Sequence, residues 1–204
     1  MDEKLTYIHN MYPNAKCELV YNNIFQLVVV VSLSAQTTDK RVNMCSPILF
    51  LKYPTIEALA NANIKDVSEI IRPIGMVNNK AKNIINLAKA IHNEYNDVVP
   101  KSKEELVNLP GVGNKTANVV LAEGFKIPAF PVDTHINRIA KRLYYATLND
   151  TVEDVERKLK KKIPQDMWIS MHHSLIFFGR YFCKAINPLC DECKLKGKCR
   201  KNYK

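Results

Sequence analysis

Apolar residues recur at helical spacing along most of the chain, and this pattern predicts a succession of helices. In the first of these, Leu5, Ile8 and Met11 share one side and Pro13 marks the end. The helices are expected at 4–12, as two short ones within 55–72, around 81–91, at 104–108, from 114 onward, around 136–143, at 152–163 and at 167–182. Only six glycines are present, which argues against an all-β fold.

Residues that favour helix caps mark where several of these helices begin. Thr55 precedes one of them, and either Thr38 or Asp39 is placed to cap another. Ser102 precedes a third, and Glu105 three residues later predicts a reciprocal capping box.

The most apolar segment is residues 24–33, IFQLVVVVSL, whose valines favour a buried strand by propensity. A run of this length fits a buried helix equally well by periodicity. No second strand candidate of similar quality is present to pair with it, so we predict a helix through the core. Polar residues 34–39 follow directly, which indicates that the chain emerges at a surface there. Gln36 is either part of an ordinary helix end or a side chain presented to a substrate.

A glycine turn leads into a helix at Leu109-Pro110-Gly111-Val112-Gly113-Asn114-Lys115. Gly111 and Gly113 allow close approach to the backbone, and the N–H groups of the following helix N-terminus favour an anion such as phosphate. Lys115 in the first helical turn opposes the helix dipole, so it does not serve helix stability. The alternative is an ordinary turn between helices with a surface lysine.

Residues 130–139 form another informative stretch, in which Asp133 precedes an apolar helical pattern. The carboxylate is either a helix N-cap or a reactive group held at a surface. His135, His172 and His173 lie on helix faces without a carboxylate or cysteine at ligand spacing, which favours structural roles for them.

The formal net charge of +10, from 30 basic and 20 acidic residues, suits a polyanionic partner, although a lysine-rich proteome gives the same balance. The first residues are polar and no secretory pattern follows, so we expect a soluble intracellular protein. No apolar run reaches the ~20 residues of a membrane span, and no membrane partner is expected.

The C-terminal region holds four of the six cysteines, Cys183, Cys190, Cys193 and Cys199, in the spacing C-x6-C-x2-C-x5-C. Disulfides are disfavoured in an intracellular protein. Structural zinc usually has two close cysteine pairs, whereas only one C-x2-C is present. A [4Fe-4S] cluster accepts unequal loops and is the better interpretation. The remaining Cys17 and Cys45 are expected to be small buried residues.

Taken together, these motifs resemble the endonuclease III family of DNA glycosylases, with similarity from about residue 20 to 200. LPGVGNKTANVV resembles the family's helix–hairpin–helix, VDTHINR its aspartate segment, and the four-cysteine tail its iron–sulfur loop. LSAQTTD and GMVNNKA resemble two loops that enter DNA. Two departures stand out, since the family often has several basic residues where 184–189 holds one and often has leucine in place of Met76.

The resemblance implies an all-α fold of two lobes with a DNA cleft between them. One lobe, residues 19–128, would hold six helices and the helix–hairpin–helix, and the other would join 1–18 to 129–204 with the [4Fe-4S] cluster. The expected partner is double-stranded DNA with damaged bases or abasic sites, bound by a monomer. A prokaryotic source implies the cytoplasm or nucleoid, and a eukaryotic or viral one the nucleus or cytoplasm.

The resemblance also implies roles for individual residues. Gln36 and Met76 would fill the space of an extruded nucleotide, while Gly111 and Gly113 hold a phosphate. Lys115 would attack C1′ as a neutral amine, a form that burial near the helix N-terminus favours, and form a Schiff base. Asp133 would stabilise the positive charge on the sugar and assist proton transfer.

The expected activity is that of a bifunctional glycosylase and lyase that removes oxidised pyrimidines and cuts 3′ to the abasic site. Pyrimidine dimers are an alternative lesion. A catalytically silent damage sensor on the same fold is a rival, disfavoured because Lys115 and Asp133 are both present. Adenine and mismatch-thymine glycosylases are nearer rivals, but they usually lack the lysine.

Overall fold

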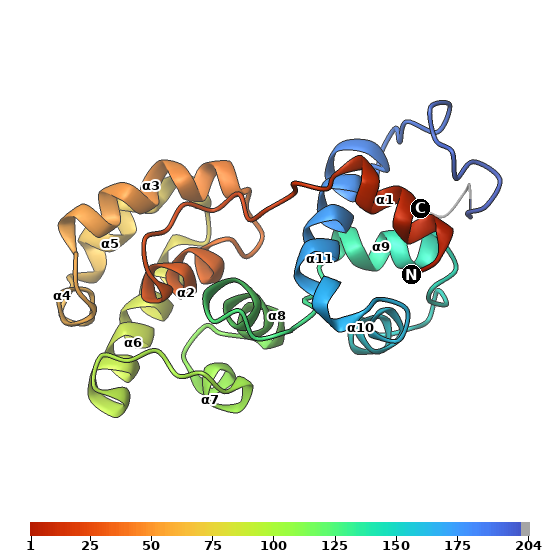
Figure 1. The fold of residues 1–204 in the computed structure, drawn as a ribbon. Coiled ribbons are helices and arrows are strands. Elements are labelled where there is room, and N and C mark those ends of the chain that lie inside the picture. The colour runs from red at the N-terminus through yellow and green to blue at the C-terminus, as the bar shows by residue number, and fades with distance from the viewer. Residues whose placement is uncertain (201–204) are drawn as a thin grey trace. The chain divides into compact units, whose positions relative to one another are not determined.

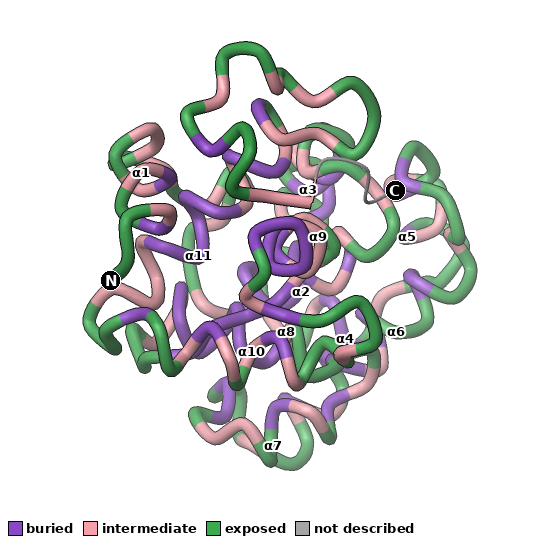
Figure 2. The backbone as a smooth tube through the Cα atoms, turned by 90° about the vertical axis from the view of Figure 1, so that its right-hand side faces the viewer, coloured by how far each residue is buried: buried purple, intermediate pink, exposed green. Residues whose placement is uncertain are grey.

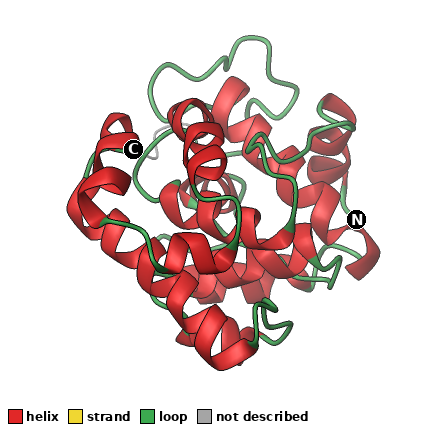
Figure 3. Ribbon diagram, turned by 90° about the vertical axis from the view of Figure 1, so that its left-hand side faces the viewer, coloured by secondary structure: helices red, strands yellow, loops and turns green. Residues whose placement is uncertain are grey.

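The computed structural model describes residues 1–200, and these form helices and loops without any strand (Figure 3). The all-α prediction is therefore confirmed for the described part of the chain. The chain divides into two compact units, one of residues 18–127 and one that joins 1–17 to the chain from Pro128 onward. The last four positions of the segment predicted as 129–204 lie outside the described residues. Across residues 1–200, we find no helix with the length and apolarity needed to span a membrane.

The unit of residues 18–127 is built around α2. Its helices occupy positions predicted from the sequence, except α3, for which only a cap at Thr38 or Asp39 was predicted. They are α2 (Ile24–Leu33), α3 (Asp39–Lys52), α4 (Ile56–Ala60), α5 (Ile64–Ile70), a 3-10 turn (Arg72–Ile74), α6 (Val77–Tyr95), α7 (Lys103–Asn108), α8 (Asn114–Val119) and a π-helical turn (Val120–Gly124). α2 packs against α3, α6 and α8. Residues 27–30 are completely buried, so the valine run is a core helix, as expected.

Side-chain caps fix the start of several helices in this unit. Asn23, Thr38 and Thr55 each accept a hydrogen bond from a backbone N–H in the first turn of the helix that follows. The hydroxyl of Ser102 likewise accepts from the N–H of Glu105, but the Glu105 carboxylate accepts from that hydroxyl at 2.6 Å. The predicted capping box is therefore only half present, because the Glu105 carboxylate accepts from the Ser102 hydroxyl and not from the backbone N–H of Ser102.

The other unit encloses a separate core, to which both ends of the chain contribute. Its elements are α1 (Glu3–Met11), α9 (Thr134–Arg142), α10 (Val152–Lys160), a 3-10 turn (Gln165–Met167), α11 (Trp168–Phe177) and a π-helical turn (Phe178–Phe182). α1 packs against α11, although some 160 residues separate them (Figure 1). α9 contributes Ile136, Ile139 and Ala140 to this core. Figure 2 shows much of α9 in the colour of buried residues.

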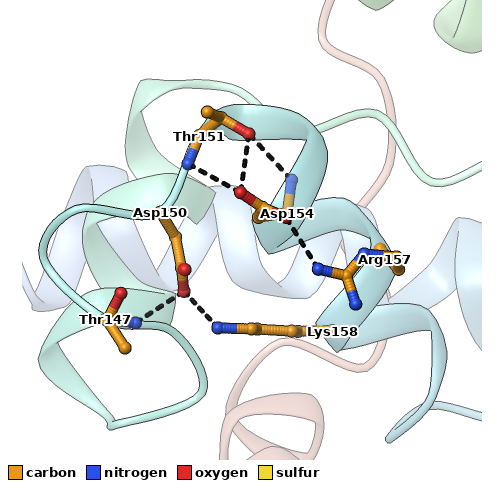
Figure 4. A network of polar contacts seen from close by, with 6 residues as sticks. All are labelled: Thr147, Asp150, Thr151, Asp154, Arg157 and Lys158. Carbon is orange, nitrogen blue, oxygen red and sulfur yellow. Dashed lines mark hydrogen bonds and ion pairs between the residues drawn. The ribbon is translucent and has the colours of Figure 1, made fainter.

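A polar network holds the loop between α9 and α10 (Figure 4). Thr151 and Asp154 form a reciprocal capping box at the start of α10. Asp150 accepts hydrogen bonds from the N–H of Thr147 and the ammonium of Lys158, and these lower its pKa to about 2, the bond from Lys158 having the larger effect.

Candidate functional site

The turn before α8 places two glycines for different reasons. Gly111 has φ +78°, and a Cβ there would lie 3.0 Å from the Cβ of Asn83, so both conformation and packing require glycine. Gly113 is the N-cap of α8 with φ −98°, and a Cβ would meet nothing within 4 Å. Neither backbone strain nor packing within the chain requires glycine at 113. The lack of a side chain leaves the first N–H groups of α8 open to a ligand.

Lys115 is the second residue of α8, and its side chain is exposed. The burial near the helix N-terminus that the resemblance led us to expect is therefore absent in the protein alone. The neighbouring helical residues Ala117, Asn118 and Val119 are buried, so α8 turns one face to the core and presents Lys115 on the other. Any exclusion of water from this amine has to come from a bound partner.

Gln36 and Met76, the two residues expected to enter DNA, both have left-handed backbones, with φ 55° and 45°. Non-glycine residues held in this region cost of order 1–3 kcal/mol each and often lie at functional sites. Gln36 is exposed in the turn between α2 and α3, and Met76 is half-exposed immediately before α6. Both side chains are thus held outward by strained turns in the unit of residues 18–127.

Asp133 is the N-cap of α9, and its Oδ1 accepts a hydrogen bond from the N–H of Ile136 at 2.8 Å. The capping role predicted as one alternative is therefore present. The side chain is only half-buried, and we find no further hydrogen bond to its carboxylate within residues 1–200. One oxygen is fixed by the helix while the other remains available for chemistry.

The backbone that leads to Asp133 is held by a histidine that the sequence analysis assigned only to a helix face. Nδ1 of His172, on α11, lies 2.9 Å from the carbonyl oxygen of Pro131. A carbonyl only accepts, so Nδ1 carries the proton and donates. His172 is 3% exposed and packs edge-on against Phe130. Its proximity to Pro131 depends on how α11 packs, which periodicity does not reveal.

His135 follows Asp133 closely, but its surroundings disfavour a positive charge. Burial lowers the pKa of His135, and the cations Arg138 and Arg180 lower it further, while Asp133 acts in the opposite direction. Nη2 of Arg138 lies 3.4 Å from His135 Nδ1, where the neutral ring can accept a hydrogen bond. The ring is therefore uncharged near neutral pH.

The four C-terminal cysteines line one cavity, whose other walls include Leu143, Phe178, Phe182 and Leu195. All four are half-buried and carry free thiols. Burial raises the pKa of Cys193, and the other three cysteines, which line the same cavity, raise it further. Within residues 1–200, however, no three ligands converge as a single metal ion needs. Soft thiol donors spread around an apolar cavity fit a polynuclear cluster better than one ion.

Arg142 fastens the start of the cysteine loop to α9, a role that the sequence analysis missed. Its Nη1 donates to the carbonyl oxygen of Lys184 at 2.7 Å and to Sγ of Cys183 at 3.3 Å, and its Nη2 reaches the carbonyl of Ala185. The side chain is 7% exposed. A hydrogen-bond donor to the Cys183 sulfur and to the loop backbone suits a cluster ligand. Of the remaining cysteines, Cys45 is buried as expected, whereas Cys17 is only half-buried.

Comparison with known proteins identifies the family. The HhH-GPD superfamily of base excision DNA repair proteins matches residues 29–165. Endonuclease III of Bacillus subtilis is 48% identical over 200 residues, which cover 98% of this chain and 91% of that protein. The chain belongs to the endonuclease III family. It is therefore a DNA glycosylase of base excision repair.

Solved structures of endonuclease III give the same result for the fold. A non-covalent endonuclease III–DNA complex matches with a TM-score of 0.94 and 45% identity, covering 97% of this chain and 92% of that one. A trapped covalent endonuclease III–DNA intermediate matches with a TM-score of 0.93, also at 45% identity, with 96% and 92% covered.

Proposed function

We propose that this endonuclease III family protein removes oxidised pyrimidines from duplex DNA and then cuts the strand 3′ to the abasic site. The observation that carries the proposal is an exposed amine, Lys115, directly after a glycine turn whose backbone N–H groups are open to a phosphate. A glycosylase that uses water as its nucleophile has no need of this lysine. The relatives support a lysine nucleophile over water, since one of the matched structures is a trapped covalent complex of endonuclease III with DNA.

Binding begins at the DNA backbone and at the lesion. The N–H groups around Gly111 and Gly113 hold a phosphate, as is common at helix N-termini. Gln36 and Met76 occupy the space left by the extruded nucleotide and its neighbours, and their outward-held turns suit such a wedge. Damage weakens stacking, which lowers the cost of extruding the lesion relative to an intact base.

Lys115 then acts as the nucleophile. Its neutral amine attacks C1′ of the sugar, the bond from C1′ to the base breaks, and the base leaves with a proton. The proton on the base comes from the attacking amine, and as the bond from C1′ to the ring oxygen opens, that oxygen takes a proton from water and a protonated Schiff base forms. Loss of a C2′ proton then expels the 3′ phosphate by β-elimination, and hydrolysis of the imine frees Lys115. Since Lys115 is exposed in the protein alone, the bound DNA must supply the water exclusion that keeps the amine uncharged.

Asp133 supports both halves of this reaction. One carboxylate oxygen stays on the N–H of Ile136, while the other faces the sugar, where positive charge develops as the base departs. The same oxygen accepts and returns protons in the steps between base loss and β-elimination.

The four cysteines Cys183, Cys190, Cys193 and Cys199 would hold a [4Fe-4S] cluster. This group would close the C-terminal loop and help it contact DNA, and it supplies no chemistry to base removal. Arg142 orients the first of these ligands through its bond to Sγ.

Strand cleavage of an abasic duplex tests the proposal. The native protein should cut the strand and leave an unsaturated aldehyde at the 3′ end, and Lys115→Gln should lose at least a hundredfold in rate. Lys65→Gln is a matched control, because Lys65 is also exposed and is also the second residue of a short helix, α5. Full cleavage by Lys115→Gln would overturn the assignment of the nucleophile.

A further inference from the structure

A buried lysine lies behind the turn that presents Met76. Lys80, on α6, is 6% exposed, although lysine is among the residues least often buried. Its position near the N-terminus of α6 opposes the helix dipole. Burial without a carboxylate partner is also unfavourable for an ammonium group. Neither helix stability nor core packing therefore accounts for a cation at this position.

Lys80 contacts both ends of the turn at residues 74–76. Its Nζ donates to the carbonyl oxygen of Ile74 at 3.4 Å, and its backbone N–H donates to the carbonyl oxygen of Met76 at 3.1 Å. Ile74 itself is anchored, with its side chain 3% exposed and its N–H bonded to the carbonyl of Ile71. Lys80 is thus hydrogen-bonded to the carbonyl oxygens of both the first and the last residue of the turn.

The two residues at the tip of this turn both have positive φ, 72° at Gly75 and 45° at Met76. Glycine adopts this conformation freely, whereas methionine is strained there. Without an anchor, the backbone at 76 would relax toward an ordinary conformation and carry the side chain with it. The bond from the backbone N–H of Lys80 is one that any residue makes at this point of a helix, whereas the side-chain bond to the carbonyl oxygen of Ile74 is specific to the lysine and is placed to oppose that relaxation.

Besides the carbonyl oxygen of Ile74, the buried Lys80 ammonium has the thiol of Cys45 in its neighbourhood. Burial lowers the pKa of Lys80, and the neighbouring Cys45 acts in the opposite direction. Cys45 lies on α3, is 1% exposed, and its Sγ is within 3.5 Å of the carbonyl oxygens of Arg41 and Val42. α3 also packs against the 3-10 turn at Arg72–Ile74. Lys80 is therefore enclosed between α3, α6 and the turn that it holds.

We propose that Lys80 is a positioning residue for base extrusion, which holds the turn at 74–76 so that Met76 projects in the conformation needed to enter DNA. The proposal rests on the wedge role given to Met76 in the proposed function. Lys80 touches neither the sugar nor the base, and it acts only through the backbone of the turn.

The test compares Lys80→Met with Lys82→Met, which removes the same charge from an exposed position two residues further along α6. Methionine has similar length and no donor, so the fold should be kept and the bond to Ile74 lost. Amide hydrogen exchange of the DNA-free protein should become faster at residues 74–80 in Lys80→Met only. If Lys80→Met does not fold, Lys80→Leu, which is also neutral and lacks a donor, serves in the same measurements.

Activity provides the second readout. Excision of an oxidised pyrimidine under single-turnover conditions should fall about tenfold in Lys80→Met, as expected for loss of a bond to a charged group. In a Met76→Ala background the same change should cost less than twofold, because the side chain that Lys80 positions is already gone. A purely structural role would instead give independent, multiplicative losses.

The outcomes separate this proposal from the proposed function. Unchanged exchange at 74–80, or equal losses with and without the Met76 side chain, would overturn the role of Lys80. Faster hydrogen exchange in Lys80→Met together with an unchanged rate of excision would also overturn the role of Lys80, since holding the turn would then have no effect on the reaction. Failure of the proposed function would appear differently, as absence of excision by the native protein itself.

Discussion

Replacement of Asp133 by asparagine separates the two roles of this side chain, because only one of them needs a negative charge. The cap uses Oδ1, which accepts from the N–H of Ile136 at 2.8 Å, and the asparagine side chain can make the same bond. Asparagine caps helices about as well as aspartate. The loss of a charge at the helix N-terminus costs about 0.3–1 kcal/mol. For a chain of this size, the melting temperature should fall by no more than about 2–4 °C.

The catalytic role should suffer far more from the same change. A group that stabilises developing charge, or that transfers protons, contributes about 100-fold or more to the rate. A 100-fold loss corresponds to about 2.7 kcal/mol of activation free energy, well above the expected change in stability. DNA affinity should change little, since the phosphate contacts come from other parts of the chain.

The assay is single-turnover excision of thymine glycol from a duplex, with binding measured separately by fluorescence anisotropy. Asp2→Asn is a matched control, because Asp2 is the N-cap of α1 and its Oδ1 accepts from the N–H of Leu5. This control should excise at the native rate. If Asp133→Asn excises within threefold of the native protein, Asp133 is only a helix cap and the mechanism is wrong.

Three further predictions concern charge, cofactor and pH. The net charge of +10 predicts that log K for duplex binding falls with log salt by ~0.9 per phosphate contact, and a flat salt titration would contradict electrostatic binding. Anaerobically purified protein should contain iron and absorb broadly in the visible range, whereas zinc without iron would refute the cluster. The variant Cys193→Ser should lose solubility or DNA affinity to a greater extent than it loses the rate of the chemical step. The pKa of Asp150, about 2 when folded, is below the ~3.9 of an unfolded aspartate, so its contribution to stability is present above pH ~4 and is lost as the pH falls toward 2. Asp150→Asn should therefore melt below the native protein at pH 7 but no longer at pH 2, and an equal difference at both pH values would refute this linkage.

The sequence predicted the helices well because local signals and burial agree along most of the chain. In the valine run the local propensity favours a strand, and the predicted helix rested on the lack of a second strand candidate in the sequence. It folds as α2 because residues 1–200 contain no strand that could pair with its backbone, while a helix satisfies the backbone internally. The caps Thr38, Thr55 and Asp133 could be recognised because capping depends on neighbours within a few residues.

Features that depend on packing between distant segments could not be predicted. Lys80 resembles a surface lysine in a polar helix turn, and only the packing of α6 within the folded unit reveals that it is buried. The contacts of Arg142 and His172 could not be predicted either, because each side chain bonds to backbone carbonyl groups about 41 residues away in the chain. The left-handed backbones of Gln36 and Met76 also have no local signal, since neither residue favours that conformation.

The central claim is that the amine of Lys115 forms a covalent bond to the sugar. Its most direct test is reduction with borohydride during reaction with a lesion-bearing duplex, followed by mass spectrometry of the cross-linked peptide. The account predicts a DNA adduct on Lys115 in the native protein and none in Lys115→Gln. An adduct on another lysine, or undiminished trapping by Lys115→Gln, would contradict it.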